Sequence, residues 1–289
     1  MPISKLKWFC EGSVPGKRLG KVRHCFYIDK LVFKGRTPYQ EILIFDNSVY
    51  GRTFVLDGIV QLSKIDEFIY HEIIVHPIMF SHPSPKKVLI VGGGDGGVLR
   101  EVLKHPIDEV YLIDIDEKLI EICKKYLPFV SQNSFADKRA KINIGDGMAF
   151  VNKFEDFFDV VIIDSNDPIG PSSKLFSQKF YGDVFRALKK DGIMIAQIGS
   201  FLDFESMITG TYRKLKKIFP FVYPYKLTMP SYNCGDYCFM GASKGIDLAR
   251  VDFRNIEKRF QKIQKKLKYY SPKIHQASMT LPKIWQIKG

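Results

Sequence analysis

From Val88 onward, short apolar runs typical of strands alternate with stretches of helical periodicity. The strand-like runs read KVLIVGG, EVYLIDID, KINIGD, DVVIIDS and GIMIAQIG, and the helical stretches between them include EKLIEICKKYLP and SQKFYGDVFRALKKDG. This alternation is typical of a parallel sheet with helices on both faces. The sequence therefore predicts an α/β fold with a Rossmann-like parallel sheet, whose ligand binds beyond the carboxyl ends of the strands.

The first part of the chain has a different pattern. Short β-type runs in CFYIDKLVFKG and YQEILIFDNSVYGRTFVLDG are separated by turn formers such as Asp57-Gly58. We expect a small antiparallel sheet there, followed by a helix over DEFIYHEIIVHPIMFSH. The predicted domains are an N-terminal β-strand domain, residues 1–62, and a Rossmann-like domain, residues 63–289.

Carboxylates follow four successive strand-like runs of the predicted parallel sheet. The sequence places Asp95 after the first run, Asp114 at the end of the second, Asp146 after the third, and Asp164 and Asp167 after the fourth. Aspartates often cap helices and shape turns, so any one of them alone is ambiguous. Because the carboxyl ends of parallel strands meet at one edge of a sheet, we expect these residues to share an acidic pocket.

The spacing of these residues indicates a nucleoside ligand. Asp114 lies about 20 residues after the glycine-rich turn GGGDGG, where an acidic side chain accepts hydrogen bonds from ribose hydroxyls. Asp146-Gly147, after the third strand, suits an adenine amino group. The order of these three elements predicts that the pocket binds an adenosine compound.

Asp95 indicates which kind of adenosine compound the pocket binds, because its charge distinguishes anionic from cationic ligands. A loop that binds phosphate uses bare backbone N–H groups and the positive end of a helix, and a carboxylate there would repel the pyrophosphate of NAD. An adenosine sulfonium carries no phosphate and at least one positive charge. The acidic edge of the sheet therefore predicts a cationic ligand.

The chain carries a formal net charge of +13, which raises nucleic acid and anionic membranes as partners. The densest basic stretch, RNIEKRFQKIQKKLKYY, has apolar residues at helical spacing and is typical of an amphipathic surface helix with a solvated lysine face. No apolar run approaches the ~20 residues that span a bilayer, and the first residues lack the apolar stretch of a signal peptide. We expect a cytoplasmic protein that binds neither nucleic acid nor membrane.

Five cysteines are scattered along the chain: Cys10, Cys25, Cys123, Cys234 and Cys238. An odd number without an export signal favours free thiols over a disulfide framework. The last two, in CGDYC, have a loose metal-like spacing, but no second Cys or His pair accompanies them. We expect no metal site.

Four segments resemble one family closely: GGGDGGVLREVLKHP, IDIDEKLIE, GDGMAFV and DSNDPIGPSSKLFSQKFY are similar to the polyamine aminopropyltransferases, and to bacterial-type spermidine synthases in particular. The resemblance extends to LKWFCE, to YQEILIFDNSVYGRTFVLDGIVQLSKIDEFIYHE and to KYYSPKIHQASMTLPKIW, and so covers nearly the whole chain. It implies transfer of an aminopropyl group from the co-substrate decarboxylated S-adenosylmethionine to a diamine, with release of methylthioadenosine. It also implies that the Rossmann-like parallel sheet is of the methyltransferase type, with a small N-terminal antiparallel β-domain. The implied assembly is a homodimer or homotetramer, with no metal and no further cofactor.

The resemblance assigns roles to particular residues. At the nucleoside it implies contacts from Gln40, Gln61, Asp114, Asp146, Gly147 and Pro171. At the reacting end it implies that Asp95 holds the aminopropyl nitrogen with help from His71. It implies that Asp164 is the catalytic proton acceptor. The residues that it places around the acceptor amine are Tyr70, Asp167, Tyr232 and Trp8. From spacing alone, His71 and the two tyrosines would be ordinary packing residues.

The chemistry explains why a carboxylate stands at the reacting nitrogen. An ammonium has no lone pair, so the acceptor must lose a proton before it attacks the carbon next to the sulfonium. A carboxylate with an ordinary pKa of about 3.9 is a weak base toward an amine with a pKa near about 10. We therefore expect Asp164 to act mainly in a dry site that aligns nitrogen, carbon and sulfur.

The sequence departs from the family pattern in three places, of which the last two surround the acceptor pocket. DSND puts Asn166 between the two acids, Gly199 stands where many relatives carry an acidic residue, and MPSYNCGDYCF has atypical residues around Tyr232, including Asp236 as a replacement carboxylate.

Putrescine is the default acceptor, and cadaverine, agmatine or spermidine stay open. A methyltransferase that uses S-adenosylmethionine is a weaker alternative because Asp95 would repel its carboxylate, and a non-catalytic polyamine or nucleoside sensor would not need a base at the reacting nitrogen.

Overall fold

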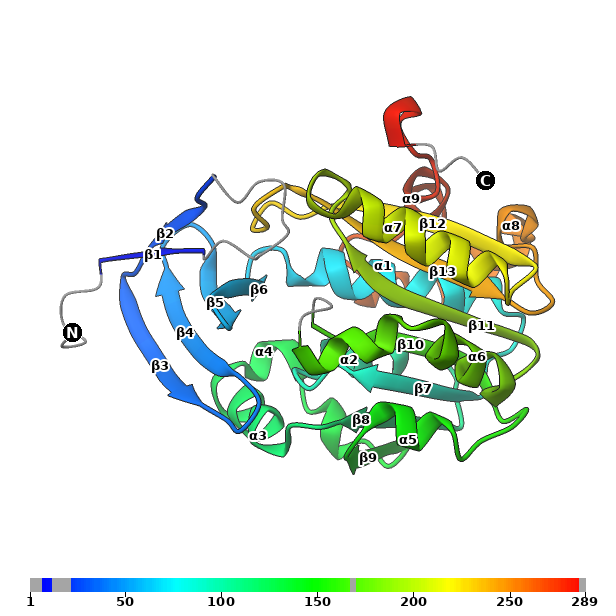
Figure 1. The fold of residues 1–289 in the computed structure, drawn as a ribbon, viewed down its shortest axis with the longest axis horizontal. Coiled ribbons are helices and arrows are strands. Elements are labelled where there is room, and N and C mark those ends of the chain that lie inside the picture. Colours follow the sequence, from blue (N-terminus) through cyan, green and yellow to red (C-terminus); the bar gives the residue numbers. More distant parts are fainter. Residues whose placement is uncertain (1–6, 12–21, 167–169, 286–289) are drawn as a thin grey trace.

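The structure is a computed structural model that describes residues 7–11, 22–166 and 170–285 (Figure 1). Its N-terminal part forms a four-stranded antiparallel sheet in the order β3-β4-β5-β6. The strands are β3 (Lys30–Arg36), β4 (Glu41–Asn47), β5 (Gly51–Leu56) and β6 (Ile59–Ser63). The predicted turn Asp57-Gly58 joins the last two strands, and both residues have positive φ, 47° and 79°, as a two-residue hairpin requires. The antiparallel N-terminal sheet is thus confirmed.

A short hairpin precedes this sheet and corrects the prediction for the cysteines. Strand β1 (Trp8–Cys10) pairs with β2 (Cys25–Tyr27) in antiparallel register, with Cys10 opposite Cys25. The two cysteines form a disulfide, so the expectation of free thiols was wrong for them. The strands are only three residues long, too short for a pattern in the sequence to show that they pair. Cys123, Cys234 and Cys238 are free, as predicted.

The rest of the chain is built on a seven-stranded sheet in the order β12-β13-β11-β10-β7-β8-β9. The five predicted strands are present as β7 (Lys87–Gly92), β8 (Glu109–Asp114), β9 (Ala140–Ile144), β10 (Phe158–Asp164) and β11 (Leu188–Gly199), and neighbours among them are parallel. The sequence did not predict β12 (Phe221–Thr228) and β13 (Asp236–Ser243), and β13 runs antiparallel to both of its neighbours. The α/β architecture is confirmed, and the division after residue 62 stays a prediction.

Helices cover both faces of this sheet, because successive residues of its strands point to opposite sides. On β7, Val88 and Ile90 belong to one core, and Leu89 and Val91 belong to the other. The first core packs against α1 (Glu67–Ser81), α2 (Gly97–Val102), α8 (Phe253–Gln261) and α9 (Pro272–Ser278). The second core packs against α5 (Gly147–Val151), α6 (Gln178–Ala187) and α7 (Phe201–Lys216).

Two further helices join the sheets to each other. Apolar residues of β4 and β5 pack against α3 (Glu117–Tyr126) and α4 (Pro128–Ser131), which lie beside the N-terminal strands in Figure 1. Five short 3-10 helices complete the described chain: η2 (Ser134–Ala136), η3 (Gly170–Phe176), η4 (Leu248–Arg250), η5 (Gln264–Lys266) and η6 (Lys283–Trp285). The N-terminal sheet is thereby fixed over one end of the parallel strands.

The lysine-rich stretch forms the expected amphipathic helix, but a shorter one. Helix α8 ends at Gln261 and is followed by η5, so the predicted helix is interrupted after its first half. Ile256 is buried, and Phe260, Ile263 and Leu267 pack partly buried against the first core. Within the described ranges, no helix has the length and apolar character needed to cross a membrane.

Candidate active site

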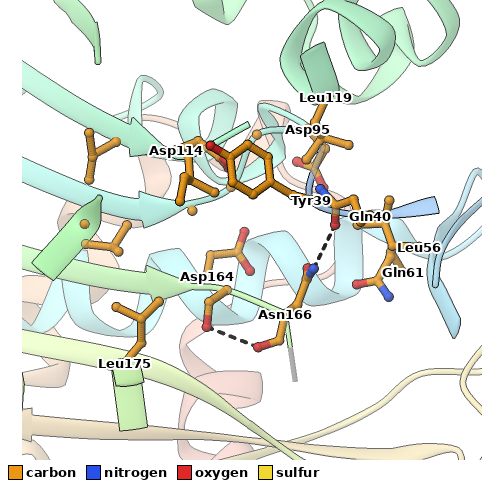
Figure 2. Close-up of a pocket in the computed structure, with 18 of the residues that line it drawn as sticks. Tyr39, Gln40, Leu56, Gln61, Asp95, Asp114, Leu119, Asp164, Asn166 and Leu175 are labelled. Atoms are coloured by element: carbon orange, nitrogen blue, oxygen red, sulfur yellow. Dashed lines mark hydrogen bonds between the residues drawn. The ribbon is translucent and has the colours of Figure 1, made fainter. Parts of the chain in front are cut away.

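A cavity of about 560 Å³ lies between the N-terminal sheet and the carboxyl ends of β7, β8, β9 and β10. Figure 2 shows Gln40, Asp95, Asp114 and Asp164 around this space, from elements far apart in the sequence. The predicted site residues that line it are Gln40, Gln61, Tyr70, His71, Asp95, Asp114, Asp146, Gly147, Asp164 and Tyr232. The structure therefore brings most of the predicted residues together, while their roles stay predictions.

Among the described residues, Trp8 is a predicted site residue that does not line the cavity. Trp8 lies on β1 with 57% of its surface exposed and packs edge-on against Tyr27. Asp167 lies outside the described residues. Pro171 belongs to η3, and its side chain also lies outside what the structure describes. The implied contacts of these residues with substrate stay predictions.

The glycines of the turn at the end of β7 leave space for Asp114 and Asp164, which pack directly against their backbone. A Cβ atom on Gly92 would lie 2.1 Å from the carbonyl oxygen of Asp164, and one on Gly94 would lie 2.8 Å from the Asp114 carboxylate. Gly92, Gly93 and Gly96 also have positive φ, which favours glycine. The glycines let the turn pack directly against the carboxylates at the ends of β8 and β10.

The end of the cavity that is predicted to bind the nucleoside is held together by two residues to which the sequence assigned no role. Asp116, the N-cap of α3, accepts hydrogen bonds from Thr37 Oγ1 and from Gln40 Nε2, the latter at 2.9 Å. Asn166 Nδ2 donates to Gln40 Oε1 at 2.9 Å, the dashed line in Figure 2. Both atoms of the Gln40 amide are thus oriented. In the sequence, Asn166 was only a departure from the family pattern. The contacts of Gln40 with Asp116 and Asn166 span 76 and 126 residues, so no local pattern in the sequence could predict them.

Asp114 and Asp146 have different surroundings. The Oδ1 atom of Asp114 accepts from the backbone N–H of Asp116 at 2.9 Å, and burial raises the pKa of Asp114 to about 6. Asp146 is exposed and caps α5, where its Oδ1 accepts from the N–H of Met148 at 2.7 Å. The helix-capping role that aspartates often take is thus confirmed for Asp146, beside its place in the cavity.

The electrostatic centre of the cavity is formed by Asp95 and Asp164. Desolvation in the cavity, and then the charge of Asp95, raise the pKa of Asp164 to about 7. Desolvation acts in the same direction on Asp95, but His71 and the backbone N–H of Gly97 hold the pKa of Asp95 below its ordinary value. One carboxylate therefore stays charged while the other titrates near neutral pH, a separation typical of acid–base sites. The pKa of Asp164 therefore lies above the ordinary carboxylate value of about 3.9 that its residue type alone implies.

Two side chains of helix α1 contact these carboxylates. The Tyr70 hydroxyl donates to Asp164 Oδ1 at 2.7 Å, and His71 Nε2 lies 3.6 Å from Asp95 Oδ2. Burial lowers the pKa of His71, but Asp95 and Glu67 outweigh it and raise that pKa to about 10. His71 is therefore a buried cation between two carboxylates.

Three tyrosines, Tyr70, Tyr232 and Tyr237, form an aromatic wall of the cavity near Asp164. The ring of Tyr70 lies 5.7 Å from that of Tyr237, which in turn lies 5.1 Å from that of Tyr232. The Tyr232 hydroxyl donates to the carbonyl oxygen of Gln61 at 2.8 Å, and the Tyr237 hydroxyl donates to Gln197. Tyr237 is a residue of β13 that the sequence did not single out, although it belongs to the atypical segment MPSYNCGDYCF.

A second cavity of about 60 Å³ adjoins this wall and shares Gln61, Tyr232 and Tyr237 with the first. Asp203 and Asp236 also line it. Asp236 Oδ1 accepts from Ser200 Oγ at 2.7 Å, and its Oδ2 accepts from Phe201 N at 2.9 Å, so this carboxylate holds the start of α7. Among the described residues, no group of three or more His, Cys, Asp or Glu side chains is arranged to hold a metal ion.

Comparisons with known proteins show the family to which the chain is similar. Two family models match: the spermine/spermidine synthase domain over residues 67–255, and the spermidine synthase tetramerisation domain over residues 7–64. A polyamine aminopropyltransferase of Thermoanaerobacter pseudethanolicus is 44% identical over 279 residues, which cover 96% of both chains. One of Caldicellulosiruptor saccharolyticus is 41% identical over 280 residues, again 96% of both.

Solved structures are similar over the same extent. A spermidine synthase in complex with the transition state analogue AdoDATO superposes with a TM-score of 0.90 and is 39% identical, covering 97% of this chain and 94% of that one. The spermidine synthase from Thermotoga maritima superposes with a TM-score of 0.88 at 39% identity, covering 96% and 92%. Both the N-terminal sheet and the parallel sheet thus have counterparts in solved structures.

Proposed function

This chain belongs to the spermidine synthase family of polyamine aminopropyltransferases, and we propose that it transfers the aminopropyl group of decarboxylated S-adenosylmethionine to putrescine. The products are spermidine and methylthioadenosine. Membership in a family of aminopropyl-transferring enzymes leaves the methyltransferase and the sensor without support.

The observation that carries this proposal is the pair of carboxylates, Asp95 and Asp164, with separated pKa values in one cavity. Asp95 stays charged and receives the primary ammonium of the donor through a charge-assisted hydrogen bond. Asp164 has a pKa of about 7 and accepts a proton from the acceptor ammonium near neutral pH. The deprotonated nitrogen then attacks the carbon next to the sulfonium, the carbon–sulfur bond breaks, and its electron pair stays on sulfur as a neutral thioether.

We assign the nucleoside to the side of the cavity formed by Gln40, Gln61, Asp114 and Asp146-Gly147. Gln40 is held by Asp116 and Asn166, which supports a contact of fixed geometry with the bound nucleoside. The solved relative that binds the analogue AdoDATO superposes over nearly the whole chain, which supports the same placement here. Proximity and alignment of the two substrates then add to the basicity of Asp164.

We place the acceptor amine along the aromatic wall of Tyr70, Tyr232 and Tyr237, where the apolar ring faces suit the methylene chain of a diamine. A second candidate is a longer or differently charged acceptor, namely cadaverine, agmatine or spermidine. The adjoining cavity, which Asp203 and Asp236 line, favours this candidate because it extends the same wall.

The experiment that tests the proposal measures methylthioadenosine release from decarboxylated S-adenosylmethionine, with putrescine, cadaverine, agmatine and spermidine offered separately. A kcat/KM at least about tenfold higher for putrescine than for any other amine is the expected result, since tenfold corresponds to about 1.4 kcal/mol of selectivity. Preference for another amine would assign that acceptor instead. Release with none of the four would overturn the proposed acceptor class.

We also propose a homodimer or homotetramer. The match of residues 7–64 to a tetramerisation domain supports self-association through the N-terminal part. Sedimentation equilibrium of the whole chain distinguishes the two states from a monomer. The cytoplasmic location stays a prediction from the sequence.

A further inference from the structure

Helix α1 is buried almost all round, yet it carries four glutamate and histidine side chains in its buried surface. Glu67, His71, Glu72 and His76 are each at most 2% exposed. Burying a charged group costs several kcal/mol unless it is paired and hydrogen-bonded, so each of these groups needs a partner inside the protein. The partners of Glu67 and His71 lead to the cavity.

Glu67 is held from two sides. One of its oxygens, Oε2, lies 2.7 Å from His71 Nδ1, one helical turn further along α1. Arg100 of α2 donates to both of its oxygens, at 3.1 Å and 2.9 Å. Because the carboxylate can only accept, the His71 Nδ1 carries the proton of this bond, and Nε2 points toward Asp95 at 3.6 Å.

Arg100 is itself fixed in place. Its Nε donates to Glu101 Oε1 at 2.6 Å, and one terminal nitrogen donates to the carbonyl oxygen of Val130 at 2.6 Å. Glu101 in turn contacts His76 Nε2 at 2.9 Å and Lys104 Nζ at 2.6 Å. Charges of alternating sign therefore run from Asp95 in the cavity through the buried layer between α1 and α2.

The glycine turn leaves space for the His71 ring. A Cβ atom on Gly97 would lie 2.3 Å from two atoms of the imidazole, closer than any real contact. The backbone N–H of Gly97 also donates to Asp95 Oδ1 at 2.7 Å. One residue therefore fixes the positions of both Asp95 and the His71 ring.

We propose that Glu67 and Arg100 are positioning residues for aminopropyl transfer: they hold His71 as a cation against Asp95 and thereby shape the electrostatic field at Asp164. Neither residue is placed in contact with a substrate. The inference rests on the proposed function and names residues to which that function assigned no role.

The charges that face Asp164 explain why this matters. Asp95 from the glycine turn and Asp114 from β8 oppose its ionisation, whereas His71 and the Tyr70 hydroxyl from α1 favour it. Lys174 of η3 also lines the cavity. If Glu67 lost its charge, His71 would lose the carboxylate bound to its Nδ1, and Arg100 would be paired with Glu101 alone. His71 would then release its proton more readily. The charge of Asp95 would then act on Asp164 without compensation and raise the pKa of Asp164 further.

Helix α1 offers a matched control for a purely structural role. Glu72 is buried as deeply as Glu67, but its carboxylate accepts from the backbone N–H groups of Lys268, Tyr269 and Tyr270. It holds the C-terminal segment against α1 and does not line the catalytic cavity. Glu72→Gln therefore removes the same charge from the same helix without changing the partners of His71.

The experiment compares Glu67→Gln and Glu72→Gln with the wild type in the pH dependence of kcat and in the KM for the donor. For Glu67→Gln we expect the fall of kcat on the acidic side of the pH profile (the acid limb) to move to higher pH by about one unit, which is the effect of one nearby charge. We also expect the KM for the donor to rise about fivefold. Glu72→Gln should lose thermal stability and keep the wild-type limb and KM. The proposal would be overturned if the acid limb of Glu67→Gln lay at the same pH as that of the wild type, or if both variants changed equally.

A second measurement does not depend on variants of Glu67. In ¹⁵N-histidine-labelled enzyme, with the His71 signal assigned from a His71→Asn spectrum, His71 should stay protonated above pH 8, consistent with its pKa of about 10. Titration of this signal below pH 7 would overturn the proposal even if Glu67→Gln did not fold. If the wild type released no methylthioadenosine with any amine, the proposed function would fail, while the state of His71 would still be measurable.

Discussion

The Tyr70 hydroxyl donates a 2.7 Å hydrogen bond to Asp164, and this contact joins the buried helix α1 to the carboxyl end of β10. The two residues are 94 positions apart in the sequence. The bond orients the Oδ1 atom of Asp164. It also stabilises the carboxylate against the neighbouring charge of Asp95.

Asp164→Asn removes the proposed proton acceptor. We expect kcat to fall by about 10³-fold, the usual range for loss of a general base, with less than about twofold change in methylthioadenosine affinity. Steady-state kinetics and calorimetry measure the two quantities. The matched control is Asp159→Asn on the same strand, because Asp159 binds the backbone N–H groups of Lys86 and Lys87 and does not line the cavity. Turnover close to wild type in Asp164→Asn would remove Asp164 from this role.

The wild-type pH profile should report the raised pKa of Asp164. A base must be deprotonated to act, so activity is lost as pH falls through the pKa of about 7 and recovers above it. We expect kcat to rise about tenfold per pH unit below pH 6 and to level off above pH 8, measured at saturating concentrations of both substrates. A limb near pH 4 would show that Asp164 has an ordinary pKa and would contradict this prediction.

Tyr70→Phe removes the hydrogen bond that favours the charged form of Asp164. The pH below which kcat falls should therefore move up by roughly half a unit to one unit, which lowers the deprotonated fraction of Asp164, and with it kcat, about two- to fivefold at pH 7. Tyr223→Phe is the control, since its hydroxyl donates to Asp247 at 2.9 Å in a tyrosine–carboxylate pair outside the cavity. Equal pH profiles for the two variants would disprove the role of Tyr70.

Asn166→Ala frees the Oε1 atom of Gln40 at the nucleoside end. Loss of one oriented hydrogen bond should weaken methylthioadenosine binding about three- to tenfold, which calorimetry can resolve. A double-mutant cycle with Gln40→Ala tests the path of the effect, because Asn166→Ala should change the affinity little when Gln40 is already absent. Additive losses would mean that Asn166 acts independently of Gln40.

Gly97→Ala places a methyl group where the His71 ring lies. Because the new Cβ would meet the ring at 2.3 Å, either the ring or α2 must shift, and we expect kcat/KM to fall about 100-fold. Gly210→Ala in α7 is the matched control, since a Cβ atom there has no neighbouring atom within 4 Å. The control should keep full activity and gain stability by up to about 1 kcal/mol. Full activity in Gly97→Ala would show that the ring position is not critical.

The disulfide and the β12–β13 hairpin show where the sequence was insufficient. Cys10 and Cys25 are joined because two three-residue strands pair, and pairing between such short strands is decided by the packing around them. The edge hairpin combines Pro224 with small residues such as Gly241 and Ala242, which weakens the strand pattern. In both cases contacts with the rest of the fold override weak local preferences.

By itself, the sequence determined the parallel sheet, the antiparallel N-terminal sheet and the edge at which the carboxylates gather. These follow from period and order: apolar runs form strands, alternation with helices makes the strands parallel, and residues after parallel strands share one edge. Only the tertiary structure decided the charge states in the cavity and the partners of Glu67. A pKa depends on burial and on distances to other charges, and Arg100 reaches Glu67 across 33 residues, so no local pattern encodes either.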